Sequence, residues 1–195
     1  MIACLLLSAG FSSRFGSPKA LARLDQQTVI EHLQELLLAT EIHEIIVVLG
    51  HGAGQIKPFL FKHKKIKVVY NKNYKFGQTS SFKCGLKHIA APTTGILLFP
   101  VDYPLIKRET VHALITFFED KKPLILIPGY QDNKGHPPVF DVRLKNEFLG
   151  LENALGVNTV IHHHADEVTV LPVADPGVIK SFNTKKEFEQ LKAEL

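Results

Sequence analysis

The stretch LSAGFSSRFGSPKAL (residues 7–21) decides the fold class, because it leaves the apolar run IACLLL (2–7) through a loop rich in Gly and Ser. A short apolar run that ends at such a loop is typical of a buried strand. The loop also carries Arg14 and Lys19, two cations that a simple turn does not need. The stretch therefore predicts a buried strand followed by a loop suited to an anion.

The loop chemistry predicts a triphosphate site. Gly10 and Gly16 permit positive φ and close approach of the backbone to a ligand, and successive backbone N–H groups in a turn form an anion-binding concavity. Arg14 offers a planar fork of donors and Lys19 a point charge. The loop is not a Walker A motif, because Ser17 follows the second glycine where that motif has Lys. On local chemistry alone, a glycine-containing loop with two solvated cations remains an alternative.

Further apolar runs follow, separated by amphipathic segments with apolar residues three and four apart. The expected strands are EIIVVL (44–49), IKVVY (66–70), GILLF (95–99), LILIP (124–128) and EVTVL (167–171). The expected helices cover 29–37, 82–89 and 111–118, with others near 144–161 and 184–194, and Thr28 and Thr79 are the expected N-caps. This alternation predicts an α/β fold in one domain (1–195): a mostly parallel, Rossmann-like sheet with helices on both faces, a three-layer sandwich.

In such sheets, ligands bind outside the carboxyl ends of the strands. This rule selects the loops that follow the expected strands, namely 8–19, 50–54, 71–78, 100–104 and 129–137.

Composition narrows the classes of protein. The chain of 195 residues is 45% hydrophobic and 22% charged, as in ordinary globular proteins. No apolar run is long enough to span a bilayer, and two cysteines give no disulfide framework, so we expect a cytoplasmic protein without a membrane partner. The net charge of +4 suits an anionic ligand, or reflects a solvated patch at KHKKIK (62–67). Basic and aromatic residues do not interleave in a known nucleic-acid readout pattern, and we expect no nucleic-acid partner.

The opening stretch resembles the L-A-A-G-x-S-x-R-M-G-x-x-K-x-L signature of the MobA-like nucleotidyltransferases, and the molybdenum cofactor cytidylyltransferases are the most similar branch. Other segments are similar to motifs of that branch and occur in the same order. They are NKNYKFGQTSSFKCGL (71–86), FPVDYP (99–104), GHPPVF (135–140) and ADPGV (174–178).

The resemblance implies a Mg²⁺-dependent transfer of a nucleotidyl group from a nucleoside triphosphate to a phosphorylated small molecule, with release of pyrophosphate. Arg14, Lys19 and Asp102 are the implied catalytic residues, and Asp102 and Asn183 the implied metal ligands. The implied nucleotide-binding residues are Leu7, Ser8, Ala9, Gly10, Arg14, Lys19, Asn71, Ser80 and Asp102. The implied acceptor-binding residues are Gly135, His136 and Pro137.

Base preference is expected to depend on Ala9. In this family an Ala at that position accompanies CTP and a Gly accompanies GTP, and the Cβ of Ala9 should narrow the base pocket. We therefore expect CTP to bind more tightly than GTP.

Two segments depart from the family pattern. In SFNTKKE (181–187), Ser181 and Asn183 stand where the family often has acids, and NALGVN (153–158) lacks the Asp and Arg of the corresponding segment. Molybdopterin is therefore one candidate acceptor and not the necessary one. A sugar- or polyol-phosphate nucleotidyltransferase of the same fold, and a nucleotide-binding protein without turnover, remain alternatives.

The remaining reactive side chains are expected to be structural. Successive helical residues point about 100° apart, so His162, His163 and His164 cannot all face one ion and are expected at a solvated helix end. Cys4 and Cys84 are expected to pack in the first strand and on a helix.

Overall fold

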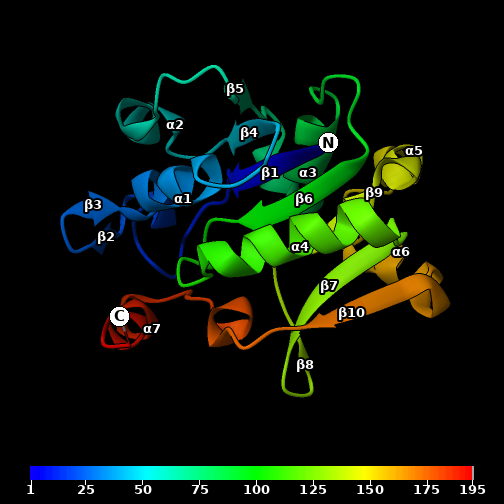
Figure 1. Cartoon of the computed structure of the whole chain (residues 1–195). Coiled ribbons are helices and arrows are strands. Elements are labelled where there is room, and N and C mark those ends of the chain that lie inside the picture. Colours follow the sequence, from blue (N-terminus) through cyan, green and yellow to red (C-terminus); the bar gives the residue numbers. More distant parts are fainter. Residues whose placement is uncertain (195) are drawn as a thin grey trace.

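The computed structural model describes residues 1–194 and contains an eight-stranded mixed sheet and a two-stranded hairpin (Figure 1). The sheet contains β1 (Ile2–Ser8), β4 (Glu44–Leu49), β5 (Ile66–Tyr70), β6 (Gly95–Pro100), β7 (Ile125–Tyr130), β8 (Asn133–Lys134), β9 (Val139–Asp141) and β10 (Val168–Pro172). The hairpin pairs β2 (Arg23–Leu24) with β3 (Gln27–Thr28).

The strand order is β10-β7-β9-β6-β1-β4-β5, with β8 paired to β7. β1 is parallel to β4 and β6, β4 is parallel to β5, and β7 is parallel to β10. The short strand β9 is antiparallel to both β6 and β7. The mostly parallel α/β sheet predicted from the alternating pattern is confirmed, and β1 lies near its centre.

Helices cover both faces of the sheet. The helices are α1 (Val29–Leu38), α2 (Ala53–Ile56), α3 (Gln78–Leu86), α4 (Arg108–Lys121), α5 (Lys145–Gly150), α6 (Asn158–His163) and α7 (Lys185–Lys192). Figure 1 shows α1 and α4 on one face and α3 on the other. Because successive strand residues face opposite sides, Cys4 and Leu6 join one apolar cluster with α1 and α4, whereas Leu5 and Leu7 join a second with α3.

Two sequence predictions about helix boundaries have different outcomes. Thr28 caps α1 in a capping box with Glu31, as predicted. The prediction for Thr79 is wrong, because α3 begins one residue earlier and is capped by Gly77 at φ 87°. The hydroxyl of Thr79 instead donates a hydrogen bond of 2.6 Å to the Leu155 carbonyl.

The helix expected near 144–161 is two short helices. α5 ends at Gly150, and α6 begins only at Asn158, so the segment 151–157 forms a turn-rich connection. The three histidines lie at the end of α6, where His164 contacts Glu147 and Glu167 at 2.8 and 3.0 Å. These carboxylates raise the pKa of His164.

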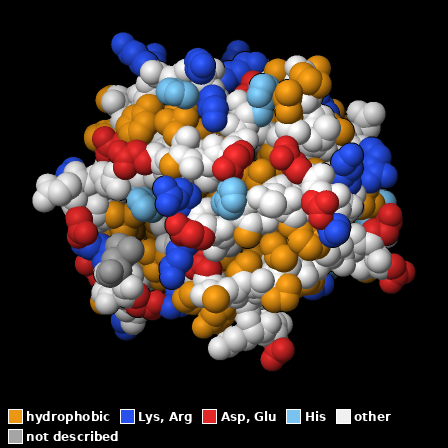
Figure 2. Space-filling model, viewed as in Figure 1, with side chains coloured by type: hydrophobic (Ala, Val, Ile, Leu, Met, Phe, Trp, Pro, Cys, Tyr) orange, Lys and Arg blue, Asp and Glu red, His pale blue; other side chains and the backbone are white. Residues whose placement is uncertain are grey.

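The surface in view carries charged side chains of both signs together with hydrophobic patches. Figure 2 shows Lys and Arg side chains mixed with Asp and Glu over the face that α1 and α4 cover. None of the helices within residues 1–194 combines the length and apolar character that crossing a bilayer requires. Cys4 is buried in β1 and Cys84 is half-buried on α3, and burial raises the pKa of both thiols.

Candidate active site

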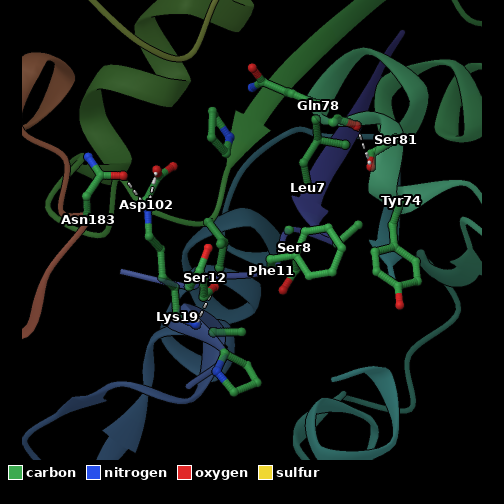
Figure 3. A pocket seen from close by; sticks show the side chains of 18 of the residues that line it. Leu7, Ser8, Phe11, Ser12, Lys19, Tyr74, Gln78, Ser81, Asp102 and Asn183 are labelled. Carbon is green, nitrogen blue, oxygen red and sulfur yellow. Dashed lines mark hydrogen bonds and ion pairs between the residues drawn. The ribbon is translucent and has the colours of Figure 1, made fainter. Parts of the chain in front are cut away.

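A cavity of about 380 Å³ opens at the carboxyl edge of the central strands, a volume within the range of small-molecule sites. Three of the five loops predicted from the strand pattern line it, those over 8–19, 71–78 and 100–104. Loops 50–54 and 129–137 contribute no lining residue. The lining side chains include Leu7, Ser8, Phe11, Ser12, Lys19, Tyr74, Gln78, Ser81, Asp102 and Asn183 (Figure 3).

A cluster of four charged or polar side chains lies at one end of the cavity. Lys19 Nζ donates to Asp102 Oδ2 and to Asn183 Oδ1, each at 2.9 Å, and Arg14 donates to the same Asn183 oxygen at 3.1 Å. Figure 3 shows the Lys19 side chain ending between Asp102 and Asn183. The side chains of Lys19 and Asp102 are 12% and 26% exposed, so this ion pair is only partly screened by solvent. The structure thus brings the implied catalytic and metal-binding residues together.

An aromatic cluster holds this arrangement together. Phe15 lies next to Arg14 in the opening loop, and its ring packs edge-on against Phe182 and Phe188 at centroid distances of 5.3 and 5.9 Å. All three rings are buried. The backbone N–H of Phe182 also donates to the Asp102 carbonyl at 3.2 Å. The contacts of the C-terminal segment thus position Asn183 beside the opening loop.

The opening loop is a tight turn around Ser12. The amides of Phe15 and Gly16 both donate to the Ser12 carbonyl at 2.9 Å, and Gly16 adopts φ 84°, as its glycine identity predicts. These two amides are therefore occupied within the turn. Lys19 follows on a 3₁₀ turn, η1 (Lys19–Leu21), and its amide donates to the Ser12 hydroxyl at 3.2 Å. The Phe15 and Gly16 amides are therefore not available to an anion, and Arg14 and Lys19 are the charged donors of the loop.

Asp102 and Asn183 direct one oxygen each at the same ammonium group. A position that accommodates a cation between a carboxylate and an amide oxygen suits Mg²⁺, which prefers hard oxygen ligands and keeps several waters. The residues present therefore fit a divalent ion with two protein ligands. Within the described chain, no cluster of three or more His, Cys, Asp or Glu side chains provides a complete metal site.

Asn71 and Ser80 are buried behind the cavity lining. The Asn71 amide donates to Ser80 Oγ at 2.9 Å and to Ser81 Oγ at 3.0 Å, while its oxygen accepts from the Asn73 amide at 2.9 Å. These bonds fix the loop between β5 and α3. Their direct contact with a nucleotide stays a prediction, whereas Ser81, which the sequence analysis did not select, lines the cavity.

The segment Gly135–Pro137 does not line the cavity. The His136 ring packs on Tyr103 at a centroid distance of 4.4 Å, and its buried Nδ1 has no hydrogen-bond partner among residues 1–194. Burial lowers the pKa of His136, and the nearby Asp102 carboxylate only partly opposes this. Its role toward an acceptor remains a prediction.

The family-like segments GHPPVF (135–140) and ADPGV (174–178) pack against each other. His136 N–H donates to the Val178 carbonyl at 2.7 Å, and a Cβ on Gly135 would lie 2.5 Å from that carbonyl oxygen. Val178 belongs to η6 (Pro176–Ile179), which the buried Asp175 caps. Only glycine permits this approach at position 135.

Sequence reasoning did not identify two other features of the site. Phe11 and Tyr74 line the cavity, but Phe11 gives no motif signal, and Tyr74 was assigned no role although it lies in the family-like segment 71–86. A second hollow of about 510 Å³ adjoins the cavity and is lined by residues 75–79 and 153–156. The second of these segments departs from the family pattern.

The comparison with known families agrees with this geometry. The model of the MobA-like NTP transferase domain matches residues 4–168, most of the chain. The chain belongs to this family. The match ends before Asn183, so the segment that completes the polar cluster lies outside the matched range.

Individual MobA-like relatives carry different names. The bifunctional protein GlmU of Alkaliphilus metalliredigens is 31% identical over 120 residues, which is 60% of this chain and 25% of GlmU. This chain thus matches about a quarter of the length of GlmU. The nicotine blue oxidoreductase of Paenarthrobacter nicotinovorans is 29% identical over 72% of this chain and 71% of that protein. A "Probable molybdenum cofactor guanylyltransferase" of Bacillus cereus is 32% identical over 57% of this chain and 54% of its own length.

Solved structures show the same fold over nearly the whole chain. Rv0371c of Mycobacterium tuberculosis H37Rv superposes with a TM-score of 0.86 at 24% identity, covering 98% of this chain and 97% of that one. Its complex with manganese has a TM-score of 0.82 at 23% identity, covering 100% and 99%. A nucleotidyl transferase from Methanothermobacter, Mth528, has a TM-score of 0.83 at 19% identity, covering 100% and 97%.

Proposed function

We propose that this protein is a nucleotidyltransferase that moves CMP from CTP to a phosphorylated small molecule and releases pyrophosphate. The observation that carries the proposal is the convergence of Lys19, Arg14, Asp102 and Asn183 at one end of a cavity of nucleotide size. The family membership supports the reaction class. An oxygen of the acceptor phosphate attacks the α-phosphorus, and the bond from that phosphorus to the β-phosphate oxygen breaks.

The two cations of the opening loop bind the β- and γ-phosphates. Lys19 and Arg14 neutralise the negative charge that builds up on the leaving pyrophosphate, and this electrostatic stabilisation is a main source of catalysis in such transfers. The partly buried position of Lys19 strengthens its interaction with phosphate relative to a lysine in water. The cavity walls fix the nucleoside so that the α-phosphorus faces the acceptor.

Asp102 and Asn183 hold a divalent cation, for which Mg²⁺ is the proposed physiological ion. When bound, this ion polarises the phosphate oxygens that it contacts. The manganese complex of a structural neighbour supports a divalent ion in this fold. Because one carboxylate and one amide are weaker ligands than two carboxylates, the free protein binds the ion weakly and the nucleotide phosphates supply much of the coordination.

CTP is the proposed donor because position 9, which lines the cavity, is Ala and not Gly. The relative named as a guanylyltransferase makes GTP the principal competitor. A direct comparison of the two nucleotides decides between them.

The test is a screen of CTP, GTP, ATP and UTP with Mg²⁺ by thermal shift, followed by pyrophosphate release with acceptors. A nucleotide at about 100 times its Kd adds roughly 2.7 kcal/mol to the free energy of unfolding, or about 5–10 °C in Tm for a domain of this size. Pyrophosphate release with CTP and a phosphorylated acceptor supports the proposal. Nucleotide binding without release under any acceptor contradicts it and favours a binding protein without turnover.

The acceptor panel contains molybdopterin together with sugar phosphates and polyol phosphates. The changed segment 153–158 favours including the sugar and polyol phosphates. Mass spectrometry of the product identifies which phosphate received the nucleotidyl group.

A further inference from the structure

Three aromatic rings from three different loops meet beside the cavity. Phe11 follows β1, His51 follows β4, and Tyr74 lies on η3 (Tyr74–Phe76) after β5. The Phe11 ring lies 5.3 Å from His51 and 5.2 Å from Tyr74, while His51 and Tyr74 are 6.1 Å apart. These distances and tilted orientations are those of favourable aromatic pairs. The three rings form one aromatic group at the carboxyl edge of the sheet.

Close packing of the backbone holds this group in place. A Cβ on Gly50 would lie 2.5 Å from Tyr74 Cβ and 2.7 Å from the Ala9 carbonyl oxygen. The loops after β1 and β5 therefore approach each other across a position that only glycine can occupy. The amide of His51 also donates to the Ala9 carbonyl at 3.1 Å. Tyr74 is thus fixed beside the residue that borders the proposed base pocket.

Phe11 is not a core residue, although it is large and apolar. It is 48% exposed, yet it lines the cavity together with Tyr74. In Figure 3, Lys19, Asp102 and Asn183 lie on one side of the cavity and Tyr74 on the other, with Phe11 between them. The cavity therefore has a charged end and an aromatic end. A nucleoside triphosphate has the same division between its phosphates and its flat base.

We propose that Phe11 and Tyr74 form a wall on which the base of the nucleotide stacks. The inference rests on the proposed nucleotidyl transfer and adds two binding residues to it. Base–aromatic stacking tolerates every base, because each has a π-face. The wall therefore contributes affinity and orientation for any nucleoside triphosphate, whereas the choice between CTP and GTP depends on the Ala9 side of the pocket. His51 contacts the Phe11 ring and is not part of the cavity lining.

The experiment compares ligands with and without a base. Isothermal titration measures the Kd of CTP, GTP and inorganic tripolyphosphate for wild type, Phe11→Leu and the matched control Tyr70→Leu. Tyr70 is 50% exposed, similar to Phe11, but it lines neither this cavity nor the adjoining hollow. We expect Phe11→Leu to weaken the binding of CTP and GTP roughly five- to 150-fold, the range for loss of one stacked base. The affinity of Phe11→Leu for tripolyphosphate and all three affinities of Tyr70→Leu should stay at the wild-type values.

A fluorescent variant gives an independent signal. The chain contains no Trp, so Phe11→Trp introduces a single indole at the wall. Stacking of a base on the indole should quench its fluorescence on addition of CTP, whereas tripolyphosphate should leave the emission unchanged. Thermal melting of each variant confirms that the exposed substitution leaves the fold intact.

The possible failures are distinguishable. If Phe11→Leu binds CTP as tightly as wild type, the wall is refuted while nucleotidyl transfer stands. If Phe11→Leu weakens the binding of CTP and of tripolyphosphate equally, Phe11 maintains the shape of the opening loop and does not contact a base. This result also refutes the wall. If wild type binds no nucleoside triphosphate, the proposed function and the wall fail together.

Discussion

Substitution of Asp102 by Asn separates the contribution of this carboxylate to stability from its contribution to the reaction. In the free protein, Asp102 accepts a 2.9 Å hydrogen bond from Lys19, and both side chains are mostly buried. Asn retains an acceptor oxygen for the Lys19 ammonium, so the hydrogen bond remains charge-assisted and only the ion-pair attraction is lost. For a partly exposed pair this should cost about 1 kcal/mol, or roughly 2–4 °C in Tm for a chain of this length.

The effect on turnover should be much larger. A metal ion provides several kcal/mol of charge stabilisation to a phosphoryl transition state. If the Asp102 carboxylate accounts for about 3 kcal/mol of this through its metal, the loss in kcat/KM is about 150-fold. The loss should be smaller at high Mg²⁺ concentration, because mass action partly restores the bound ion.

The assay is pyrophosphate release across a Mg²⁺ titration, with circular dichroism melts of the same samples. Asp120→Asn is the matched control, since Asp120 is exposed near the end of α4 and remote in sequence from the site. We expect wild-type turnover for the control. For Asp102→Asn we expect lower turnover and a higher Mg²⁺ concentration at half-maximal activity. Normal turnover of Asp102→Asn at every Mg²⁺ concentration would show that Asp102 is not the metal ligand.

Four further predictions concern the phosphate loop, the base pocket and the fold. Arg14→Ala and Lys19→Ala should each weaken the binding of CTP roughly ten- to a hundredfold, because each removes charge-assisted hydrogen bonds to phosphate. Isothermal titration measures the Kd, and unchanged values in both variants would favour the alternative of a loop with two solvated cations. CTP should bind more tightly than GTP, and Ala9→Gly should reduce this preference in the same titration; equal or tighter GTP binding by wild type contradicts the expectation. Asp175→Ala should lower the free energy of unfolding in urea by about 3 kcal/mol, because the buried carboxylate accepts three hydrogen bonds of 2.7–2.9 Å whose donors lose their partner. Burial lowers the pKa of His32 below its ordinary 6.5 in the folded protein, so the unfolded chain binds a proton at His32 more tightly than the folded protein does. The free energy of unfolding should therefore fall as the pH drops below about 6.5. Between about pH 7.5 and about pH 5.5, wild type should lose more unfolding free energy than His32→Gln, and equal losses would contradict the assignment.

The parallel strands could be predicted from the sequence because each is a continuous apolar run. β9 could not, since its three residues carry no periodic pattern and it pairs only because β6 and β7 flank it. The end of α5 could not be predicted from the sequence of segment 151–157 either. Its apolar residues continue a helical spacing, but the turns between α5 and α6 end the helix.

The charged end of the candidate site could be predicted to a greater extent than the aromatic end. Arg14, Lys19 and Asp102 are charged residues in loops after apolar strands, a pattern that the sequence displays directly. Phe11 and Tyr74 lie on separate loops, and their contact depends on the space that Gly50 leaves between those loops. No local spacing encodes such a contact.

The contact between Lys19 and Asn183 joins residues 164 positions apart, and the Phe15–Phe182 packing spans a similar separation. On the ribosome, at about 5–20 residues per second, roughly 8–30 s pass between synthesis of the two halves of this contact. During that interval β1, β4, β5 and β6 are already made and can pair, whereas the phosphate loop still lacks its C-terminal partner. A nascent chain can therefore hold much of its sheet before it has an assembled charged end, so the polar cluster around Lys19 forms only after Asn183 has been made.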